Sequence, residues 1–305
     1  MTTKRMLTLV ATIVMAAMPA LAQPATKLAI SYSATSDFLA TFVAKDAGIF
    51  EKHGLDVTLS NLATTALGPP ALQAGSLQIA SISPPLLLLA NDSGLDLVAV
   101  AAVGSLNAEH ASSSFITRPG VTIAKAQDLV GLKVGRPGIN SAIDMLLKKW
   151  LLDRNVAPDL VTLIETPFPQ MGDRLKAGQL DAAVALEPIR SRIVASGAGT
   201  RSLDFISEVN PHIVAAIYGS TRDWATANLA AVREFRAALI EAMKFIPDNQ
   251  AQTDAIQQKY LGAASAPVDL ALDLKPSDFD LWIGIMKQLK LLQQPAPDAT
   301  TLIVN

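Results

Sequence analysis

The stretch ALQAGSLQIASISPP, residues 71–85, contains the local pattern that decides the fold. This pattern predicts a helix that ends at Gly75, then a short apolar strand, and then a further helix that begins at the prolines. The stretch RLKAGQLDAAVALEP, residues 174–188, repeats this order with six identical residues in fifteen positions. Because alanine and leucine are common here, a shared helix–glycine–strand plan is the alternative explanation. We favour two related α/β lobes, with Ser83 and Glu187 at corresponding strand ends.

The alternation of strands and helices continues on both sides of these stretches. Strands are expected at residues 28–33, 55–59, 77–82, 97–103, 132–135, 160–164, 182–186 and 213–218. Helices are expected at residues 37–47, with Asp37 as the cap, and at 141–154, 170–177, 188–195, 225–245, 252–260 and 277–291. This alternation predicts an α/β fold in which each lobe is a mostly parallel sheet flanked by helices.

The chain is long enough for two lobes. We expect lobe 1 to be discontinuous, with residues 23–116 and 221–305, and lobe 2 to occupy residues 117–220. The connections between them are expected near Phe115–Thr117 and Tyr218–Thr221. In open α/β sheets, ligands bind outside the carboxyl ends of the strands, where helix N-termini point.

The first 22 residues have the layout of a secretory signal peptide. Lys4 and Arg5 precede an apolar run at residues 6–18, and the sequence PALA, residues 19–22, ends in a small-x-small pattern. A membrane anchor is the alternative, but the run is shorter than the about 20 residues that span a bilayer. We expect cleavage near Ala22, and export to the periplasm without a lipid-carrying cysteine.

Composition excludes several classes of protein. Of 305 residues, 50% are hydrophobic and 17% are charged, which argues for a packed core rather than a disordered chain. The net charge of −2 argues against nucleic acid as a partner. The absence of cysteine removes disulfides, thiol nucleophiles and thiolate metal sites. We therefore expect neither a metal nor a cofactor.

Four motifs occur in an order that resembles a known family. They are VAKDAGIFEKHGLDV at residues 43–57, ALQAG at 71–75, DLVGLKVG at 128–135, and LKAGQLDAA at 175–183 followed by Glu187-Pro188. In this order the chain resembles the periplasmic solute-binding proteins of the nitrate/sulfonate/taurine type, a family that also includes binders of thiamine pyrimidine precursors. The resemblance covers nearly the whole chain after the signal segment.

The resemblance implies a two-lobed type II periplasmic binding protein fold. It further implies a small-molecule ligand in the cleft between the lobes and an ABC permease of the inner membrane as partner. We expect a monomer. The chain departs from the common pattern of this family at two places that bear on the identity of the ligand. Gln78 stands where many relatives carry aspartate, and the loop GRPGINS at residues 135–141 differs from the commoner Gly-Ser form.

Ten residues at strand ends or hinge positions are candidates for contacts with the ligand. Each has a structural alternative: a helix cap for Ser141, a core position for Phe38, a solvated turn for Thr64 and Thr65, and a first-turn acid that complements the helix dipole for Glu187. Arg136 is either a partner for an anionic ligand or a surface residue. The candidates are Ser33, Thr35, Phe38, Thr64, Thr65, Ser83, Asn140, Ser141, Glu187 and Tyr218.

The expected ligand is a small anionic organic molecule, such as a sulfonate or carboxylate. Backbone N–H groups at helix starts favour anions, and Phe38, Phe168, Tyr32 and Tyr218 permit an aromatic ligand. The alternative ligand is a pyrimidine-type heteroaromatic, for which Glu187 would be the acceptor. A protein that presents its solute to a membrane receptor is the alternative role.

An enzyme is a poor fit to the sequence. A Gly-x-Ser-x-Gly elbow, a phosphate-binding P-loop, a dinucleotide-binding glycine motif and a His-Glu-x-x-His motif are all absent. The fungal pyrimidine-precursor synthase resembles the chain in fold only and depends on a cysteine-rich segment that is absent here. We therefore expect a binding protein.

Overall fold

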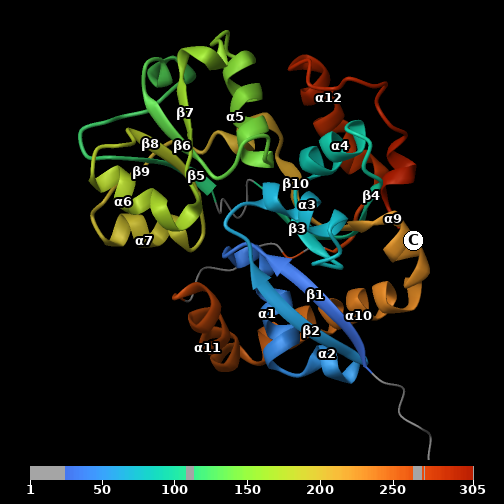
Figure 1. The fold of residues 1–305 in the computed structure, drawn as a ribbon. Helices are drawn as coiled ribbons and strands as arrows, with labels where there is room; N and C mark the ends of the chain where they lie inside the picture. Colours follow the sequence, from blue (N-terminus) through green and yellow to red (C-terminus); the bar gives the residue numbers. More distant parts are fainter. Residues whose placement is uncertain (1–24, 108–112, 264–269, 271, 305) are drawn as a thin grey trace, which may run out of the picture.

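The structure, a computed structural model, describes residues 25–107, 113–263, 270 and 272–304. Two lobes, each built on a sheet, lie side by side in Figure 1, with lobe 2 in green and yellow and lobe 1 formed by the blue, teal, orange and red segments. The predicted signal segment lies outside the described residues. Within them, no helix combines the length and the apolarity that crossing a bilayer requires.

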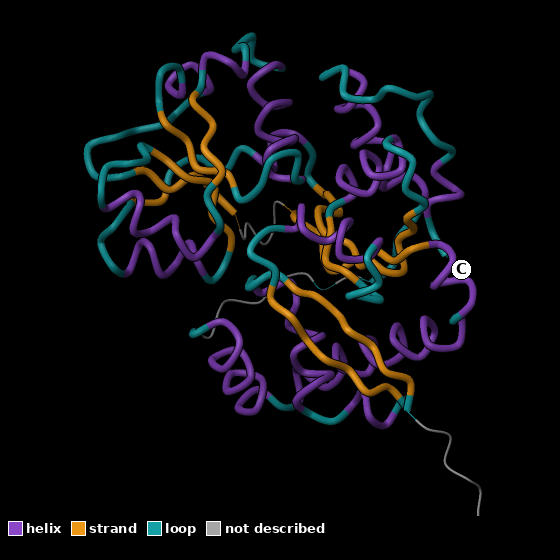
Figure 2. Tube along the Cα trace, viewed as in Figure 1, coloured by secondary structure: helices purple, strands orange, loops and turns teal. Residues whose placement is uncertain are grey.

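Lobe 2 contains a five-stranded sheet in the order β7-β6-β8-β5-β9. Strands β7, β6 and β8 are parallel, and β5 runs antiparallel to both β8 and β9. Its helices cover the two faces (Figure 2). The elements are β5 (Ser113–Thr117), β6 (Lys133–Arg136), α5 (Ala142–Leu152), β7 (Thr162–Glu165), α6 (Met171–Lys176), β8 (Ala182–Leu186), α7 (Ile189–Ala195), β9 (Thr200–Arg201) and α8 (Ile206–Val209).

Lobe 1 combines the two ends of the chain. Its first part contains β1 (Thr26–Tyr32), α1 (Leu39–Asp46), α2 (Ile49–Lys52), β2 (Leu55–Asn61), α3 (Gly68–Gln73), β3 (Ala80–Ile82), α4 (Pro84–Asp92) and β4 (Leu97–Asn107). Its second part contains β10 (His212–Thr221), α9 (Arg222–Ala227), α10 (Leu229–Asp248), α11 (Gln250–Leu261) and α12 (Asp280–Gln288). The late strand β10 lies between β3 and β4 and is antiparallel to both.

A bridge between Ile30 and Ile79 joins the β1-β2 pair to this sheet in parallel register. Each lobe therefore has one strand, β5 or β10, that runs against the others, and the prediction of mostly parallel sheets is confirmed. The pattern follows from the alternation of strands with helices, because a helical crossover returns the chain to run in the same direction.

Two large hydrophobic cores stabilise the fold, one inside lobe 1 and one shared by both lobes. In lobe 1, α1 and α10 bury their apolar faces against the sheet, with Phe42, Phe50 and Phe235 fully buried. The second core spans both lobes, since α5 of lobe 2 packs against α4 and α12 of lobe 1. Trp150 and Trp282 are fully buried in it. The lobes are thus packed together along one side.

The observed elements differ from the predicted ones at a few boundaries. The helix predicted at residues 225–245 is two helices, α9 and α10, separated at Asn228. The segments expected as connections, Phe115–Thr117 and Tyr218–Thr221, are paired inside β5 and β10. Strand β4 belongs to the sheet of lobe 1 and β5 to the sheet of lobe 2, and the chain returns to lobe 1 between α8 and β10. The predicted domain boundaries stay a proposal about which residues move together.

Candidate ligand-binding site

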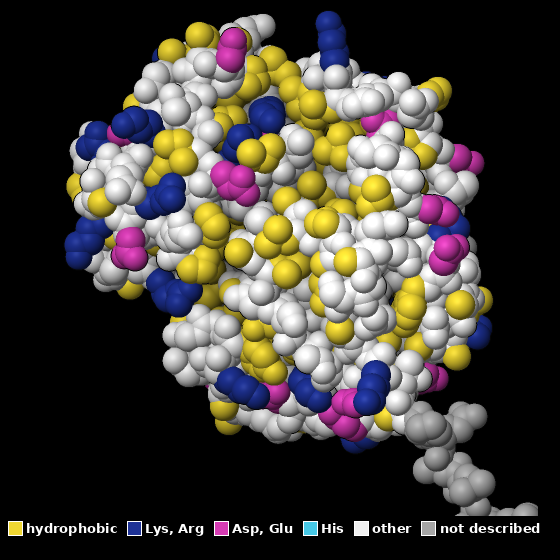
Figure 3. Space-filling model, in the orientation of Figure 1, with side chains coloured by type: hydrophobic (Ala, Val, Ile, Leu, Met, Phe, Trp, Pro, Cys, Tyr) yellow, Lys and Arg dark blue, Asp and Glu magenta, His cyan; other side chains and the backbone are white. Residues whose placement is uncertain are grey.

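A cavity lies between the lobes at the carboxyl ends of strands β1, β2 and β3. It encloses about 890 Å³, a volume that includes space open to solvent. In Figure 3, hydrophobic side chains are visible along the band between lobe 2 at upper left and lobe 1. Both lobes contribute lining residues. The position agrees with the expectation that ligands bind where strands end and helices begin.

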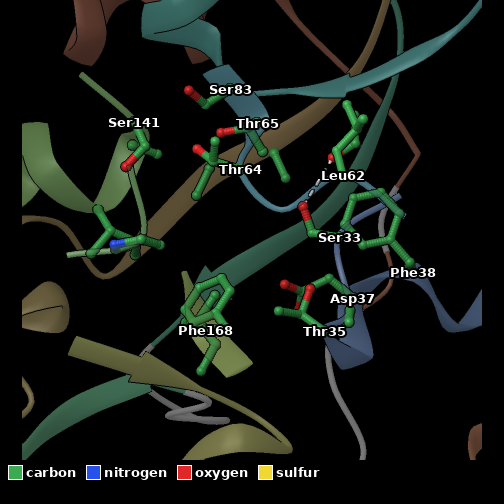
Figure 4. Close-up of a pocket in the computed structure, with 18 of the residues that line it drawn as sticks. Ser33, Thr35, Asp37, Phe38, Leu62, Thr64, Thr65, Ser83, Ser141 and Phe168 are labelled. Atoms are coloured by element: carbon green, nitrogen blue, oxygen red, sulfur yellow. Dashed lines mark hydrogen bonds between the residues drawn. The ribbon is translucent and has the colours of Figure 1, made fainter. Parts of the chain in front are cut away.

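Lobe 1 supplies most of the polar groups of the cavity. They come from the loops that follow β1 and β2 and from β3, β4 and their ends, and they are Ser33, Thr35, Asp37, Asn61, Thr64, Thr65, Ser81, Ser83 and Ser105. Figure 4 shows Ser33, Thr35, Asp37, Thr64, Thr65 and Ser83 around the opening. Hydroxyl groups both donate and accept hydrogen bonds, so this wall suits a polar group of either kind.

The hydroxyl of Ser83 is buried and has no hydrogen-bond partner in the described structure. Ser83 is only 2% exposed, and its Oγ is among the few buried polar atoms without a partner. It occupies the N-cap position of α4, yet its side chain forms no capping hydrogen bond. Because a buried polar group is stabilised by a hydrogen-bond partner, this hydroxyl is available to a polar group bound in the cavity.

Asp37 is the one ionisable side chain among the described residues that line the cavity. It lies in the 3-10 helix Ser36–Phe38 and is partly buried. Burial raises the pKa of the Asp37 carboxyl to about 6, while a hydrogen bond with the Thr35 side chain acts in the opposite direction. At neutral pH the carboxyl is therefore mainly ionised, although its surroundings penalise the charge.

Lobe 2 covers the cavity with mostly apolar groups. Its lining residues are Pro137, Ser141, Ala142, Ile143, Phe168, Pro169 and Leu186. The Ser141 hydroxyl is already engaged as the cap of α5: its Oγ lies 2.9 Å from the Gly138 carbonyl oxygen, to which it donates, and 3.4 Å from the Asp144 backbone nitrogen, from which it accepts. Recognition of polar groups on a ligand therefore falls mainly to lobe 1.

The lobes touch on both flanks of the cavity. On one flank, the backbone N–H of Ser36 donates to the carbonyl oxygen of Glu187 across the cleft, at 3.1 Å. On the other, Gly138 lies so close to Thr64 that a Cβ at residue 138 would be 2.5 Å from Thr64 Oγ1. These contacts hold the cavity in a closed arrangement.

The structure brings seven of the ten predicted residues together around the cavity. They are Ser33, Thr35, Phe38, Thr64, Thr65, Ser83 and Ser141. Their contact with a ligand stays a prediction, but their convergence follows from the geometry of parallel strands, whose carboxyl ends meet at one edge of the sheet.

Asn140, Glu187 and Tyr218 lie outside the lining. Asn140 has a φ of 57° in the turn before α5, and its backbone N–H donates to Asp144. The Glu187 carboxylate accepts hydrogen bonds from Arg190 Nε at 2.7 Å and Ser191 Oγ at 2.9 Å, so it positions α7.

Tyr218 is 1% exposed and fills the core of lobe 1 beneath the cavity. Its hydroxyl forms a hydrogen bond with Thr41, and its ring packs edge-on against Phe38 at 5.8 Å. Arg136, considered as a partner for an anion, forms an ion pair with the buried Asp144 instead. The structure thus provides internal partners for the side chains of Glu187 and Tyr218 and for one terminal nitrogen of Arg136, while Arg136 Nε has no partner among the described residues.

The sequence reasoning missed several lining residues. The sequence predicts Asp37 as a helix cap, whereas its side chain lines the cavity and the N-cap of this 3-10 helix is Thr35. Phe168 was noted only as an aromatic that could stack on a ligand. Its place directly after Pro167, at the start of a short 3-10 helix, is the same kind of strand-end position that pointed to Ser33. Asn61, Leu62 and Ser105 also line the cavity without being among the predicted residues.

Comparison of the sequence with known families and proteins identifies relatives. The sequence model of the NMT1-like family matches residues 21–259. A candidate binding protein of Brucella abortus (strain 2308) is 27% identical over 230 residues, which cover 75% of this chain and 69% of that protein. A candidate binding protein of Brucella suis biovar 1 (strain 1330) matches to the same extent. These relatives are named as binding proteins, in agreement with the expectation that the chain is not an enzyme.

Solved structures share the fold at low sequence identity. The alkanesulfonate-binding protein SsuA from Xanthomonas axonopodis pv. citri, bound to MOPS, superposes with a TM-score of 0.78 at 16% identity, covering 92% of this chain and 98% of that one. The periplasmic aliphatic sulphonate-binding protein SsuA from Escherichia coli gives 0.73 at 18% identity, with 91% and 97% covered. The periplasmic nitrate-binding protein NrtA from Synechocystis PCC 6803 gives 0.76 at 16% identity, with 91% and 85% covered. The predicted two-lobed type II periplasmic binding protein fold is confirmed.

Proposed function

Because this chain belongs to the NMT1-like family, we propose that it is the solute-binding component of an ABC importer. It captures one small organic solute between its lobes and delivers it to a permease of the inner membrane. The observation that carries the proposal is the cavity, because one lobe provides its polar wall and the other its apolar cover. Closure of two lobes over a solute couples occupancy to a shape that a permease recognises.

Export to the periplasm belongs to the same proposal. The signal-peptide pattern of residues 1–22 supports it, and so do the names of the structural neighbours from Escherichia coli and Synechocystis, which are described as periplasmic. The partner is then an inner-membrane permease, and the binding protein acts as a monomer.

Two ligand classes have support, and the cavity favours the second. An anionic ligand such as a sulfonate or carboxylate is suggested by two structural neighbours that are described as sulfonate-binding proteins and by the start of α5 at Ser141. However, no lysine or arginine lines the cavity within the described part of the chain, and Asp37 would repel an anion. A nitrogen-bearing organic solute, of which a pyrimidine-type heteroaromatic is one example, fits the lining better, with Asp37 as acceptor in place of Glu187.

A thermal-shift screen of the purified mature protein tests the proposal. The panel contains sulfonates, aromatic acids, nitrate, amines and pyrimidines. A specific solute at a hundred times its Kd stabilises the folded state by about 2.7 kcal/mol, which raises Tm by roughly 5–10 °C. Calorimetry on the best solute is expected to give one site per chain. The absence of any shift, together with measured turnover of one of these compounds, would refute the proposal.

A second assay separates uptake from presentation of the solute to a receptor. The loaded protein is added to membranes that contain the ABC permease encoded beside its gene. Uptake predicts that ATP hydrolysis rises only with the solute-loaded form. A sensory role predicts no rise in hydrolysis although the same solute binds.

A further inference from the structure

We propose that Asp37 is the counter-charge for a positively charged nitrogen of the solute, so that the cavity takes an organic monocation such as an amine or amidine. The inference rests on the proposed solute-binding function and names the class of ligand for that same cavity. Three features of the described residues carry it: the charge of the lining, the placement of its apolar groups, and an unpartnered hydroxyl.

The charge of the lining is unbalanced. Asp37 is its one ionisable group, and no described lysine, arginine or histidine forms an ion pair with it. The hydrogen bond with Thr35 leaves acceptor capacity on the carboxylate, which has two oxygens. A carboxylate in a partly desolvated cavity is stabilised most by a cation within hydrogen-bond distance. A monocation restores neutrality, whereas an anion would double the negative charge.

The neighbouring charges do not supply this balance. Glu187 lies across the cleft from Ser36 but is already paired with Arg190. Behind Pro137, Asp144 is shared by Arg136 and Lys148 on the side of α5. Tyr218 on β10 lies close enough for the negative charge of Asp37 to raise its pKa further, beyond the effect of burial, and it stays neutral.

Apolar side chains surround the rest of the cavity. Phe38 and Leu62 come from lobe 1, and Phe168 and Leu186 come from lobe 2. In Figure 4 the Phe168 ring lies on the opposite side of the cavity from Phe38, with Asp37 and Thr35 beside the opening between them. An apolar or aromatic body therefore suits the space between the lobes, and the partly exposed ring of Phe168 suits a cation as well.

The buried hydroxyl of Ser83 supplies a second polar point. Its Oγ has no partner among the described residues and lines the cavity, on a different strand end from Asp37. The hydroxyl can accept a hydrogen bond from one N–H of an amidine or amine, or donate one to a ring nitrogen or an oxygen of the solute. Two fixed points at separate strand ends orient a solute in the cavity.

Three probes of one shape and different charge test the proposal: benzamidine, benzamide and benzoate. Binding to the purified mature protein is measured by calorimetry at pH 7.5. Benzamidine is expected to bind about 12- to 150-fold more tightly than benzamide, the range for a hydrogen bond to a charged group, and benzoate is expected not to bind. Asp37→Asn is expected to remove the preference for benzamidine while leaving benzamide binding within about threefold of the unsubstituted protein.

Measurements of Tm distinguish a specific loss of binding from a loss of affinity that is caused by misfolding. Burial penalises the ionised Asp37, so Asp37→Asn is expected to melt at the same temperature as the natural protein or higher at pH 7.5. Asp223→Asn, at an exposed position in the first turn of α9, is the matched control and is expected to change neither binding nor Tm.

The possible failures differ from one another. Tighter binding of benzoate than of benzamidine overturns the ligand class and leaves the solute-binding function standing. Benzamidine binding that survives Asp37→Asn overturns the role of Asp37. If none of the three probes binds but a sulfonate from the wider screen does, the cation proposal fails. If no compound of any charge binds, both proposals fail.

The Ser83→Ala variant tests the second polar point separately. It removes a hydroxyl that has no internal partner, so Tm is expected to stay the same or rise. Benzamidine affinity is expected to fall by about 2- to 12-fold, the range for one neutral hydrogen bond. A fall in Tm with unchanged affinity would mean that the hydroxyl has a structural role instead.

Discussion

The two walls of the cavity present different chemical groups to a solute. Lobe 1 presents hydroxyls, an amide and the Asp37 carboxyl on the loops that follow its strands. Lobe 2 presents prolines, Ile143, Leu186 and the ring of Phe168, and the hydroxyl it contributes is engaged in capping α5. Polar recognition is therefore placed in one lobe, and exclusion of water in the other.

This division has a consequence for the order of binding. A solute that first meets lobe 1 in the open form finds nearly all of its hydrogen-bond partners there. Lobe 2 then closes over the apolar part of the solute and adds little polar selectivity. Substitutions in lobe 1 should therefore change which solute binds, while substitutions at the lobe contacts should change the affinity for all solutes alike.

The largest expected effect comes from blocking closure at Gly138. Its φ does not lie in the left-handed region, so alanine fits the backbone, but the new Cβ would be 2.5 Å from Thr64 Oγ1 in the closed form. Such overpacking costs about 1–3 kcal/mol, so Gly138→Ala is expected to weaken every ligand by roughly 5- to 150-fold. Calorimetry with benzamidine and benzamide checks that both affinities fall in parallel.

Two further variants test that reasoning. Gly284→Ala in α12 is the matched control, because a Cβ there meets nothing within 4 Å, and it is expected to leave affinity unchanged. In the double variant with Thr64→Ala, the obstructing oxygen is absent and the remaining separation to Thr64 Cβ is 3.7 Å, so part of the affinity should return. Unequal losses for the two probes would contradict the division between the walls.

The pH dependence of ligand affinity tests the role of the Asp37 carboxyl in the polar wall of lobe 1. With a pKa of about 6, the Asp37 carboxyl is mostly protonated at pH 5 and mostly ionised at pH 7. Benzamidine stays cationic in this range, so its affinity is expected to rise about tenfold from pH 5 to pH 7. The affinity for benzamide should change little, and Asp37→Asn should flatten the benzamidine profile. A profile that persists in Asp37→Asn would assign the titration to another group.

The same shift has an opposite effect on the protein without ligand. The pKa of Asp37 is raised from 3.8 to about 6, so the folded state holds this proton more tightly than the unfolded chain. The contribution of Asp37 therefore stabilises the fold at low pH, and it is lost as the pH rises from about 4 through 6. Comparison of Tm for the natural protein and Asp37→Asn across this range isolates it.

The smallest expected effect concerns the hydrogen bond from Ser36 to Glu187. Residue 36 is the first of its 3-10 helix, and Thr35 before it is extended, so proline fits there. Ser36→Pro removes the N–H that crosses the cleft and is expected to weaken all ligands by about two- to tenfold. Ser36→Ala keeps the N–H and serves as the control for the side chain. Equal losses in the two variants would show that the backbone contact contributes nothing to closure.

Much of the fold was predictable because it depends on local signals. Gly75 and Gly178 end helices with a positive φ, and prolines begin the next ones, so the strand–helix order follows from the chain itself. The convergence of Ser33, Thr64 and Ser83 was predictable for the same reason, since parallel strands end at one edge of a sheet.

The orientation of single side chains depended on tertiary contacts instead. A carboxylate before a proline has the same sequence signature whether it points into the cleft or, as Glu187 does, toward Arg190 and Ser191. Tyr218 lies in a strand whose register shifts between Tyr218 and Gly219, so alternation could not assign its face. Asp37 has the signature of a helix cap, and only the position of lobe 2 makes it part of a cavity.

The placement of β10 between β3 and β4 also sets the order in which the molecule can be completed. Lobe 2 is contiguous from residue 113 to residue 209, so all of its strands are available once that segment has been synthesised. Lobe 1 lacks its central strand until residue 221 has emerged, and the parallel bridge from Ala99 to Ile303 forms only at the end of the chain. Native pairing over such separations is slow. The growing chain thus keeps half of the molecule unfinished, a state compatible with the export proposed above, because the cavity does not yet exist at that stage.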